Sequence, residues 1–466
     1  MIVAAKSSSQ HSGSGNGADT VCLEIGSTIT KATAFGGVVG SGQNTPRYLG
    51  QGVALTSVDE GDVSIGVGQA LESLSETCPI DTENTRILAA SSAAGGLRMS
   101  VHGLTRDMTL RAAREASLGA GAVVVHTTAG GMTESDVEEL IEKSPKLVLL
   151  SGGVDYGDRD IVIANAKLLA QAQIPAPIIY AGNVSARRDV SRIFDGAGIE
   201  YFTCDNVYPR IDELNVKPVR RLIQEVFARH IVSAPGMDRV KEIVSGDIMP
   251  TPGAVLAAAE LLYDEMGDLV VVDVGGATTD VHSVTEGQPK HNRLMAAPEP
   301  LAKRTVEGDL GVFINADIIV KEAGGVIDGG DTAPMPTKQT ERDRSILLAR
   351  WAVDLAMWRH AGEIKTAFGA SGRSELVEGR DLTAVKYLIG TGGALTRLRA
   401  GRDILTNLRR DPGGRKLLPP RDVKIFIDSR YIMASAGLLA STHPDAARTI
   451  LLESLSMNSA NEGIGV

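Results

Sequence analysis

Two segments about half a chain apart share one pattern, and this repeat constrains the fold more than any other feature of the sequence. Each segment has an apolar run, one acidic residue, a glycine turn rich in hydroxyl groups and a second apolar run. The segments are 21–35 and 270–284. The residues that correspond are Glu24 with Asp273, Gly26 with Gly275, and Thr30 with Thr279. Each pattern predicts a β-hairpin, and the repeat predicts a duplicated fold with two similar halves.

The glycine turns have the composition of a phosphate-binding site. Phosphate needs clustered backbone N–H donors, and glycine permits both the tight turn and the close approach. Hydroxyl side chains add donors, and a lysine adds a positive charge. The residues predicted to bind phosphate are Gly26, Ser27, Thr28, Lys31, Gly275, Gly276, Thr278 and Thr279. The two halves are therefore predicted to hold one phosphate chain from opposite sides.

The acidic residues of the two hairpins indicate a metal ion. Glu24 and Asp273 would repel phosphate in direct contact, so they imply Mg²⁺ between carboxylate and phosphate, with water completing the coordination. We expect Asp273 to orient the metal or the attacking water, and Glu24 to assist the metal. The alternative is an ordinary pair of hairpins, since an acidic residue followed by a glycine turn is a weak signal by itself.

A third glycine-rich segment follows the second hairpin. An apolar strand from Tyr387 runs into the residues Gly390, Thr391, Gly392 and Gly393. The three glycines would let an adenine and a ribose approach the backbone, although a strand-to-helix turn without a ligand explains them equally well. The P-loop and dinucleotide-binding patterns are absent. The order of hairpin, hairpin and strand-GTGG resembles the actin, hexokinase and heat-shock chaperone superfamily, which implies bound ATP.

The composition argues against several other classes. The chain has 466 residues, of which 43% are hydrophobic and 4% aromatic, so it can bury more than one core. Its formal charge of −10 argues against nonspecific nucleic-acid binding, because a phosphate backbone attracts clustered cations. Its three cysteines form no C-x-x-C pair, which argues against a disulfide framework, a zinc site or an iron–sulfur cluster. Since no apolar run has membrane-spanning length and no signal-peptide core is visible, we expect a cytoplasmic protein.

Strands and helices alternate along the chain, which predicts a layered α/β fold. Between the hairpins, a β-α-β-α-β pattern predicts a small inserted domain with parallel strands. Glycine turns follow two of its strands, at Gly152 and Gly182, where a second ligand site and plain turn chemistry are equally good explanations. The predicted organisation is a disordered tail at 1–19, a first ATPase half at 20–99, an inserted α/β domain at 100–205, a helical connection completing the first half at 206–267, a second ATPase half at 268–455 and a flexible tail at 456–466. The predicted fold class is therefore a duplicated actin-like ATPase (ribonuclease H-like) fold with an inserted small α/β domain.

Longer motifs narrow the resemblance. They are 25–28 (IGST), 91–98 (SSAAGGLR), 151–153 (SGG), 304–311 (RTVEGDLG), 359–362 (RHAG), 390–393 (GTGG) and 431–439 (YIMASAGLL). Together they resemble the glutamate mutase accessory family, called GlmL or MutL, over residues 20–455. This resemblance implies an ATP-binding accessory protein that reactivates an adenosylcobalamin-dependent mutase, with slow Mg²⁺-dependent ATP hydrolysis driving domain motion. The chain itself is expected to bind no cobalamin, because 121–203 lacks a D-x-H-x-x-G loop.

Some alternatives stay open. Glu307 in RTVEGDLG is a candidate adenosine contact, or an acid at the N-terminus of a helix over 311–323. Glu24 departs from the family, which has Asp at this position, and the extra methylene disturbs the octahedral geometry that magnesium demands. Competing functions on the same fold are a small-molecule kinase and a scaffold protein switched by nucleotide. The expected partners are mutase subunits, contacted through 100–205, with no nucleic acid and no membrane, and a homodimer is one option for the oligomeric state.

Overall fold

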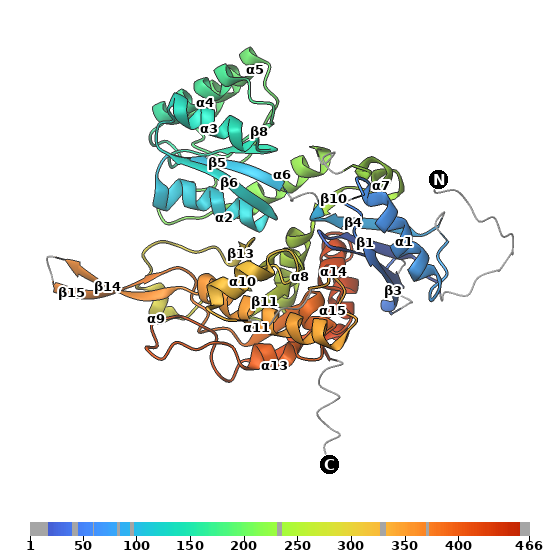
Figure 1. Ribbon diagram of the computed structural model, residues 1–466. Coiled ribbons are helices and arrows are strands. Elements are labelled where there is room, and N and C mark those ends of the chain that lie inside the picture. Colours follow the sequence, from blue (N-terminus) through green and yellow to red (C-terminus); the bar gives the residue numbers. More distant parts are fainter. Residues whose placement is uncertain are drawn as a thin grey trace. The chain divides into compact units, whose positions relative to one another are not determined.

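The computed structural model describes residues 17–39, 45–58, 60–81, 84–93, 97–230, 235–326, 332–369 and 372–456 (Figure 1). The chain divides into two compact units. Unit 1 consists of Met1–Ala94, Ile231–Leu261 and Asp428–Val466, and unit 2 consists of Gly95–His230 and Leu262–Ile427. The predicted tails at 1–19 and 456–466 lie outside the described residues, except for 17–19 and 456. None of the helices in these described ranges is both long and apolar enough to cross a membrane.

Unit 1 contains one five-stranded sheet in the order β10-β4-β1-β2-β3. Its strands are β1 (Thr20–Ile25), β2 (Ile29–Gly36), β3 (Arg47–Leu55), β4 (Arg86–Ser91) and β10 (Ile248–Pro250). Strand β2 is antiparallel to both β1 and β3, whereas β4 is parallel to both β1 and β10. The helices of this unit are α1 (Val63–Ser75), α7 (Met237–Ile243), α14 (Met433–Ala440), α15 (Pro444–Ser456) and the first part of α8 (Thr251–Met266).

Helix α1 shows how the apolar pattern builds the core of unit 1. Asp62 caps its N-terminus by accepting a hydrogen bond from the Ser64 amide at 2.9 Å. Its buried face consists of residues spaced three or four apart, namely Val63, Val67, Ala70 and Leu74. Gly52 on β3 lets this helix approach the sheet, because a Cβ at that position would lie 2.1 Å from the Ala70 carbonyl oxygen.

Unit 2 contains a second sheet of five strands in the order β13-β12-β11-β16-β17. Its strands are β11 (Leu269–Val274), β12 (Thr279–Val284), β13 (Ala302–Glu307), β16 (Tyr387–Thr391) and β17 (Lys424–Ile427). The accompanying helices are α9 (Pro289–Asn292), α10 (Ala316–Ala323), α11 (Gln339–His360), α12 (Gly393–Thr396) and α13 (Gly401–Thr406). One face of α11 packs into the core of this unit through residues such as Leu348, Ala352 and Val353.

The two sheets have the same strand order and the same strand directions. When the strands are numbered within their own sheet, each sheet runs 3-2-1-4-5. In both, strands 1 to 3 are antiparallel, and strands 4 and 5 are parallel to strand 1. This repeated sheet defines the duplicated actin-like ATPase (ribonuclease H-like) fold. The predicted fold class is therefore confirmed.

A third sheet belongs to the inserted domain within unit 2. Its five parallel strands have the order β6-β5-β7-β8-β9. They are β5 (Leu97–Gly103), β6 (Ala122–Ala129), β7 (Leu147–Leu150), β8 (Ile178–Tyr180) and β9 (Tyr201–Thr203). Helices α3 (Glu134–Lys143), α4 (Asp160–Ala172) and α5 (Arg187–Ala197) cover one face, and α2 (Arg111–Gly119) and α6 (Val216–His230) the other (Figure 1). A short π-helix, η2 (Arg106–Leu110), precedes α2, and the strand order is that of flavodoxin-like domains.

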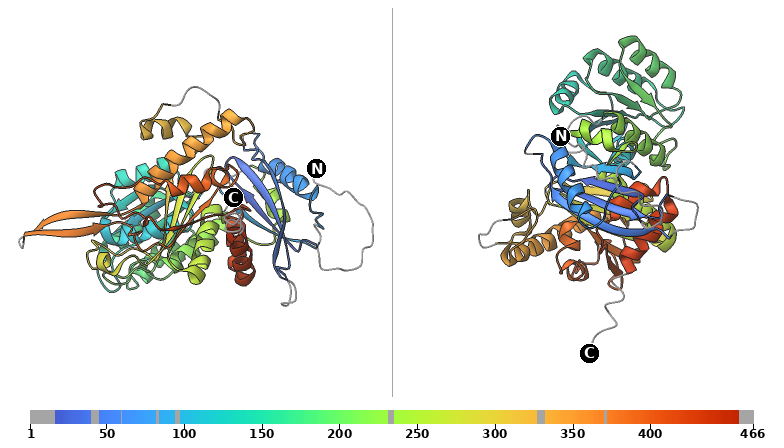
Figure 2. Two further views of the ribbon diagram at one scale, coloured as in Figure 1. Left: turned by 90° about the horizontal axis from the view of Figure 1, so that it is seen from below. Right: turned by 90° about the vertical axis from the view of Figure 1, so that its right-hand side faces the viewer.

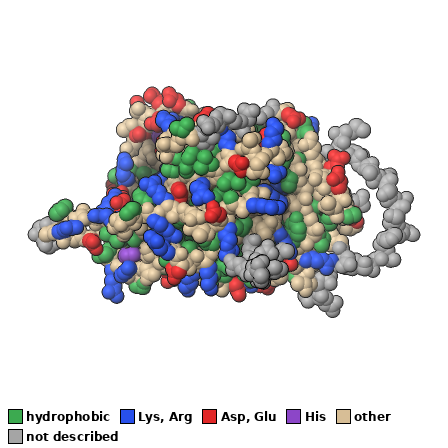
Figure 3. Space-filling view, turned by 60° about the horizontal axis from the view of Figure 1, so that its bottom comes forward, with side chains coloured by type: hydrophobic (Ala, Val, Ile, Leu, Met, Phe, Trp, Pro, Cys, Tyr) green, Lys and Arg blue, Asp and Glu red, His purple; other side chains and the backbone are tan. Residues whose placement is uncertain are grey.

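A two-stranded arm projects from unit 2 and is not among the predicted elements. Strands β14 (Glu363–Gly369) and β15 (Gly372–Glu378) are antiparallel and form a sheet of their own (Figure 2). Phe368, near the end of the arm, is 83% exposed. The space-filling view shows hydrophobic and basic side chains on the projecting part (Figure 3).

Several boundaries differ from the predicted ones. The inserted sheet begins at Leu97, and helix α6, which fell in the predicted connection 206–267, lies with the inserted sheet in unit 2. The chain from Asp428 belongs to unit 1, although the predicted second half extended to 455. The helix expected over 311–323 begins only at Ala316, because the residues before it form turns against residues 275–276.

Candidate nucleotide-binding site

The two predicted hairpins are present and share one geometry. In each, a glycine amide donates a hydrogen bond across the turn, from Gly26 to the Ile29 carbonyl at 3.0 Å and from Gly275 to the Thr278 carbonyl at 2.9 Å. The residues that lie opposite one another at the turn are Ile25 and Thr30 in the first hairpin, and Val274 and Thr279 in the second. The predicted residue-by-residue correspondence of the two hairpins is therefore confirmed.

The turn at 275–278 in unit 2 presents backbone donors. Within the described part of the chain, the amides of Gly276, Ala277 and Thr278 have no hydrogen-bond acceptor. Successive unpaired amides in a glycine turn form the concave arrangement in which proteins bind anions. The geometry of this turn suits phosphate, and its phosphate role stays a prediction.

The end of the RTVEGDLG motif and the residues after it support this turn. The Phe313 amide donates to the Gly276 carbonyl at 2.9 Å, and the Asn315 side chain donates to the Ala277 carbonyl at 2.8 Å. Gly311 packs so closely that a Cβ there would lie 2.2 Å from the Ala277 carbonyl carbon. The turn is thus held in one shape by a segment that follows it in the sequence by about 35 residues.

Both hydroxyl groups of the second hairpin are engaged within the protein. Thr278 donates to Asp280 at 3.0 Å, and the buried Thr279 hydroxyl donates to the Leu310 carbonyl at 2.7 Å. The backbone amides, rather than these hydroxyls, are the donors that the turn offers. No cluster of three or more His, Cys, Asp or Glu side chains suited to a metal ion occurs among the described residues.

Asp273 and Gly392 lie side by side at the carboxyl ends of two neighbouring strands. Strands β11 and β16 are parallel, with Asp273 opposite Thr391. Gly392 has φ of 85° and ψ of 155°, and a Cβ there would lie 2.5 Å from Asp273 Oδ1 and 2.4 Å from the Val274 carbonyl oxygen. Only glycine fits this position. The structure thus brings the second hairpin and the GTGG segment together at one edge of one sheet.

The other two glycines of the GTGG segment have different surroundings. Gly393 begins α12, and apart from its chain neighbours and its own helix no atom of the described residues lies within 4 Å of the position that its Cβ would take. Gly390 lies inside β16, where a Cβ would be 2.9 Å from the Ile427 side chain and 3.0 Å from that of Leu405. Packing against the protein accounts for Gly390 and Gly392, whereas Gly393 faces open space, and the nucleotide contacts of all three stay predictions.

Glu307 ends strand β13, opposite Thr279, and its carboxylate accepts a hydrogen bond from Arg359 at 2.8 Å. Burial raises the pKa of Glu307, and the Arg359 guanidinium opposes this effect. The following helix begins only at Ala316 and has Asp317 in its first turn. The interpretation of Glu307 as a helix N-terminal acid is therefore wrong, while the adenosine contact stays a prediction.

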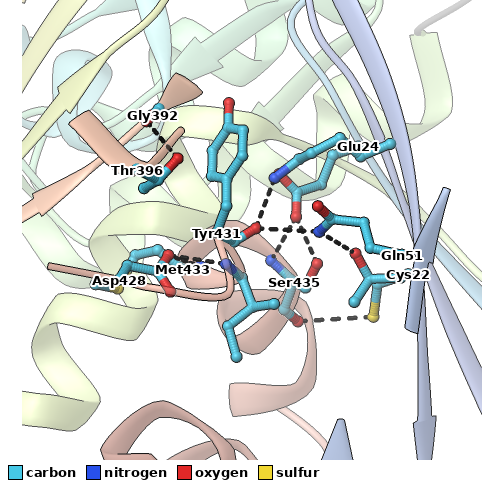
Figure 4. Close-up of polar contacts among 12 residues, drawn as sticks. Cys22, Glu24, Gln51, Gly392, Thr396, Asp428, Tyr431, Met433 and Ser435 are labelled. Atoms are coloured by element: carbon cyan, nitrogen blue, oxygen red, sulfur yellow. Dashed lines mark hydrogen bonds and ion pairs between the residues drawn. The ribbon is translucent and has the colours of Figure 1, made fainter. Parts of the chain in front are cut away.

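In unit 1, both carboxylate oxygens of Glu24 have protein donors (Figure 4). Lys31 Nζ lies 2.8 Å from Oε2, while the amide and the hydroxyl of Ser435 donate to Oε1. Lys31 Nζ also donates to the Tyr431 carbonyl at 2.8 Å and lies 3.1 Å from the centroid of the Tyr431 ring. These contacts give Glu24 and Lys31 a structural role that was not predicted, since the two charges neutralise each other. Their predicted metal and phosphate roles stay untested.

The segment 428–435 provides the other side of this cluster. Asp428 accepts hydrogen bonds from the Ile432 and Met433 amides, each at 2.8 Å, and so caps the N-terminal end of α14. Tyr431 has φ of 54°, which is uncommon for a residue other than glycine. The motif over 431–439 carries no sequence signal for this contact, because the contact of Tyr431 with Lys31 spans 400 residues.

The remaining predicted residues of the first turn are also near one another. The Ser27 hydroxyl donates to the Ser92 carbonyl at 3.1 Å, and the Thr28 carbonyl accepts from the Thr56 amide at 2.9 Å. In the described part of the chain, the amides of Ser27 and Thr28 have no acceptor. The first turn therefore offers donors similar to those of the second. Residues 94–96 of the SSAAGGL motif lie outside the described residues.

The repeated sheet and its two glycine turns define a protein of the actin-like ATPase fold class. The chain belongs to the MutL protein family, because the model of that family matches residues 20–455. Protein MutL of Clostridium tetanomorphum is 38% identical over 461 residues, which cover 92% of this chain and 97% of that protein. The family resemblance found in the sequence motifs is therefore confirmed.

Among solved structures, similarity is low. A nucleotide-free acetone carboxylase has a TM-score of 0.41 at 12% identity, covering 91% of this chain and 70% of that chain. A nucleotide-free diol dehydratase-reactivating factor has a TM-score of 0.35 at 10% identity, covering 91% of this chain and 99% of that chain. The fold assignment rests on the strand order of the two sheets rather than on these similarities.

Proposed function

We propose that this chain is an ATP-binding accessory protein that reactivates an adenosylcobalamin-dependent mutase, with slow ATP hydrolysis driving the movement of its domains. The observation that carries the nucleotide part is the close packing of Gly392 on Asp273, beside a turn in which three amides have no acceptor among the described residues. The mutase part rests on membership of the MutL family and on the resemblance of the sequence motifs to glutamate mutase accessory proteins.

The carboxylate of Asp273 in unit 2 suits a magnesium ion that is held largely through water. Magnesium keeps several waters and takes one or two carboxylates, and Asp273 lies at a strand end beside the glycine turn. The ion would supply the positive charge that lets a carboxylate and phosphates share one site. In this proposal Asp273 orients the water around the ion, the amides of 276–278 hold phosphate oxygens, and Gly392 and Gly393 lie against the adenosine.

Calorimetric titration of the full chain with MgATP tests the site. We expect Asp273→Ala to weaken binding by about 100-fold, because losing a charge-assisted contact of about 3 kcal/mol corresponds to that factor. The matched control is Asp317→Ala, which removes an exposed carboxylate of the same unit and should bind MgATP as the unaltered chain does. A folded Asp273→Ala chain with unchanged affinity would show that the site is wrongly assigned.

A reactivation assay tests whether an adenosylcobalamin mutase is the client. An inactivated mutase is mixed with the chain, fresh cofactor and ATP, and its recovered activity is measured. The occupied carboxylate of Glu24 favours a second candidate, a scaffold switched by nucleotide without turnover, because Lys31 and Ser435 hold that carboxylate away from a hydrolytic role. Comparing ATP with its non-hydrolysable β,γ-imido analogue distinguishes the two. Equal recovery with both nucleotides supports the switched scaffold, and recovery with ATP alone supports hydrolysis. No recovery, with MgATP binding intact, would reject the mutase as client.

A further inference from the structure

A path of hydrogen bonds, partly buried at Thr278 and buried beyond it, connects the turn after β11 to the inserted domain. Thr278 donates to Asp280 at 3.0 Å, and Arg304 Nε donates to the other oxygen of Asp280 at 2.8 Å. Arg304 also donates to the carbonyl oxygens of Leu118 at 3.0 Å and Ala122 at 3.2 Å. The Leu118 carbonyl lies at the C-terminal end of α2, which packs against β13 (Figure 1), and Ala122 begins strand β6 of the inserted sheet. The candidate phosphate turn and the inserted domain therefore share one arginine.

The register of the hairpin explains why a cation is needed at this place. Asp280 lies directly opposite Asp273, and like charges opposite one another destabilise a sheet. The corresponding pair in the first hairpin is Glu24 and Lys31, whose charges are opposite. In the second hairpin the positive charge comes from Arg304, which lies on the neighbouring strand β13. Arg304 is 2% exposed and Asp280 is 5% exposed, so water cannot solvate either charge and the two must balance each other.

Close to Arg304, two residues have buried polar atoms that lack a hydrogen-bond partner among the described residues. His282 lies opposite Arg304, is fully buried, and has no hydrogen bond at either ring nitrogen within the described chain. Burial lowers the pKa of His282 to about 3, so its ring is neutral. One oxygen of Glu115 on α2 is also unpaired among the described residues, although Lys303 lies 3.1 Å from the other oxygen. Buried polar groups without a partner are rare in folded proteins, and His282 and Glu115 could gain partners if α2 moved.

We propose that Asp280 and Arg304 are positioning residues that couple occupancy of the turn after β11 to the packing of α2 against β13. This inference rests on the proposed nucleotide binding at that turn and extends it. When phosphate binds the turn, the hydrogen bond between the Thr278 hydroxyl and Asp280 changes. Arg304 then redistributes its donors between Asp280 and the carbonyls of Leu118 and Ala122. Because coupling between sites is reciprocal, the packing of α2 changes the affinity of the turn in return.

Hydrogen–deuterium exchange of the full chain, with and without saturating MgATP, tests this coupling. In the unaltered chain, MgATP should change the exchange of residues 115–123, which run from the end of α2 to the start of β6. Arg304→Lys keeps the charge but loses the planar fork that reaches Asp280 and two carbonyls together. This variant should reduce the response of 115–123 by about fivefold or more. The matched control, Arg350→Lys, alters a surface pair with Asp403 in the same unit and should respond as the unaltered chain does.

The outcomes separate the coupling from the nucleotide site. Calorimetry on the same samples reports whether MgATP is bound. An unaltered chain that binds MgATP without a response at 115–123, or an equal response in Arg304→Lys, overturns the coupling and leaves the nucleotide site standing. An unaltered chain that binds no MgATP overturns both proposals. Asp280→Asn provides the same comparison if Arg304→Lys does not fold, because the amide keeps the shape of the side chain and loses the charge that holds Arg304.

Discussion

Replacing Gly392 by alanine tests whether the close approach of β16 to β11 shapes the candidate site. Gly392 has φ of 85° and ψ of 155°, a combination that is essentially restricted to glycine. An added Cβ would lie 2.4 Å from the Val274 carbonyl oxygen and 2.5 Å from Asp273 Oδ1. The Val274 atoms are backbone of a strand that is paired on both sides, so they cannot move without disturbing the sheet.

The expected cost has two parts. The backbone conformation alone costs alanine about 1–3 kcal/mol. Displacing packed neighbours adds about 1–3 kcal/mol, as overpacking typically does. Gly392→Ala should therefore destabilise the β11–β16 pair by about 2–6 kcal/mol. Gly393→Ala is the matched control, because apart from its chain neighbours and its own helix no atom of the described residues lies within 4 Å of its added Cβ, and it should leave the stability unchanged or raise it by about 0.5 kcal/mol.

Native-state hydrogen exchange of residues 269–274 measures the local free energy of opening in both variants. MgATP titration of the same samples measures the effect on the site. Gly392→Ala should open more readily and bind MgATP at least about tenfold more weakly, which corresponds to 1.4 kcal/mol. Gly393→Ala should keep its stability and bind MgATP more weakly, because its methyl group would occupy the space proposed for adenosine. If β11 exchanges in Gly392→Ala as it does in the unaltered chain, the argument from close approach is refuted.

Two further predictions concern buried ionisable groups. Lys31→Met leaves Glu24 buried without its cation, so the free energy of unfolding in urea should fall by about 3–5 kcal/mol. Adding Glu24→Gln should recover most of this loss, because the amide oxygen still accepts from Ser435, and a stable single variant would contradict the structural role of the pair. Burial lowers the pKa of His102 to about 3, so the unfolded chain takes up a proton first as the pH falls. Stability should therefore decrease between about pH 6.5 and pH 3, by up to about 5 kcal/mol, and His102→Gln should flatten this part of a pH series of thermal unfolding curves.

The hairpins and the fold class could be predicted from the sequence because both depend on short-range order. A strand, a glycine turn and a second strand involve neighbouring residues only, so the correspondence of Gly26 with Gly275 was visible in the pattern. Two hairpins, each followed by parallel strands, admit few arrangements, since crossovers between parallel strands have one hand. The flavodoxin-like inserted sheet was recognised only in part, because β5 carries polar Ser100 and His102 at buried positions and did not match an apolar pattern.

The amino-acid sequence by itself determined where the glycine turns lie, which acidic residue precedes each of them, and how the two halves correspond. Only the tertiary structure decided which partner each charge has. Glu24 contacts Lys31 across its own hairpin and Ser435 from the far end of the chain, whereas Asp280 contacts Arg304. The physical reason is burial, because a charge removed from water must find an opposite charge or a donor nearby. Which groups are nearby depends on long-range packing, and that packing also brings the chain after Asp428 back to unit 1.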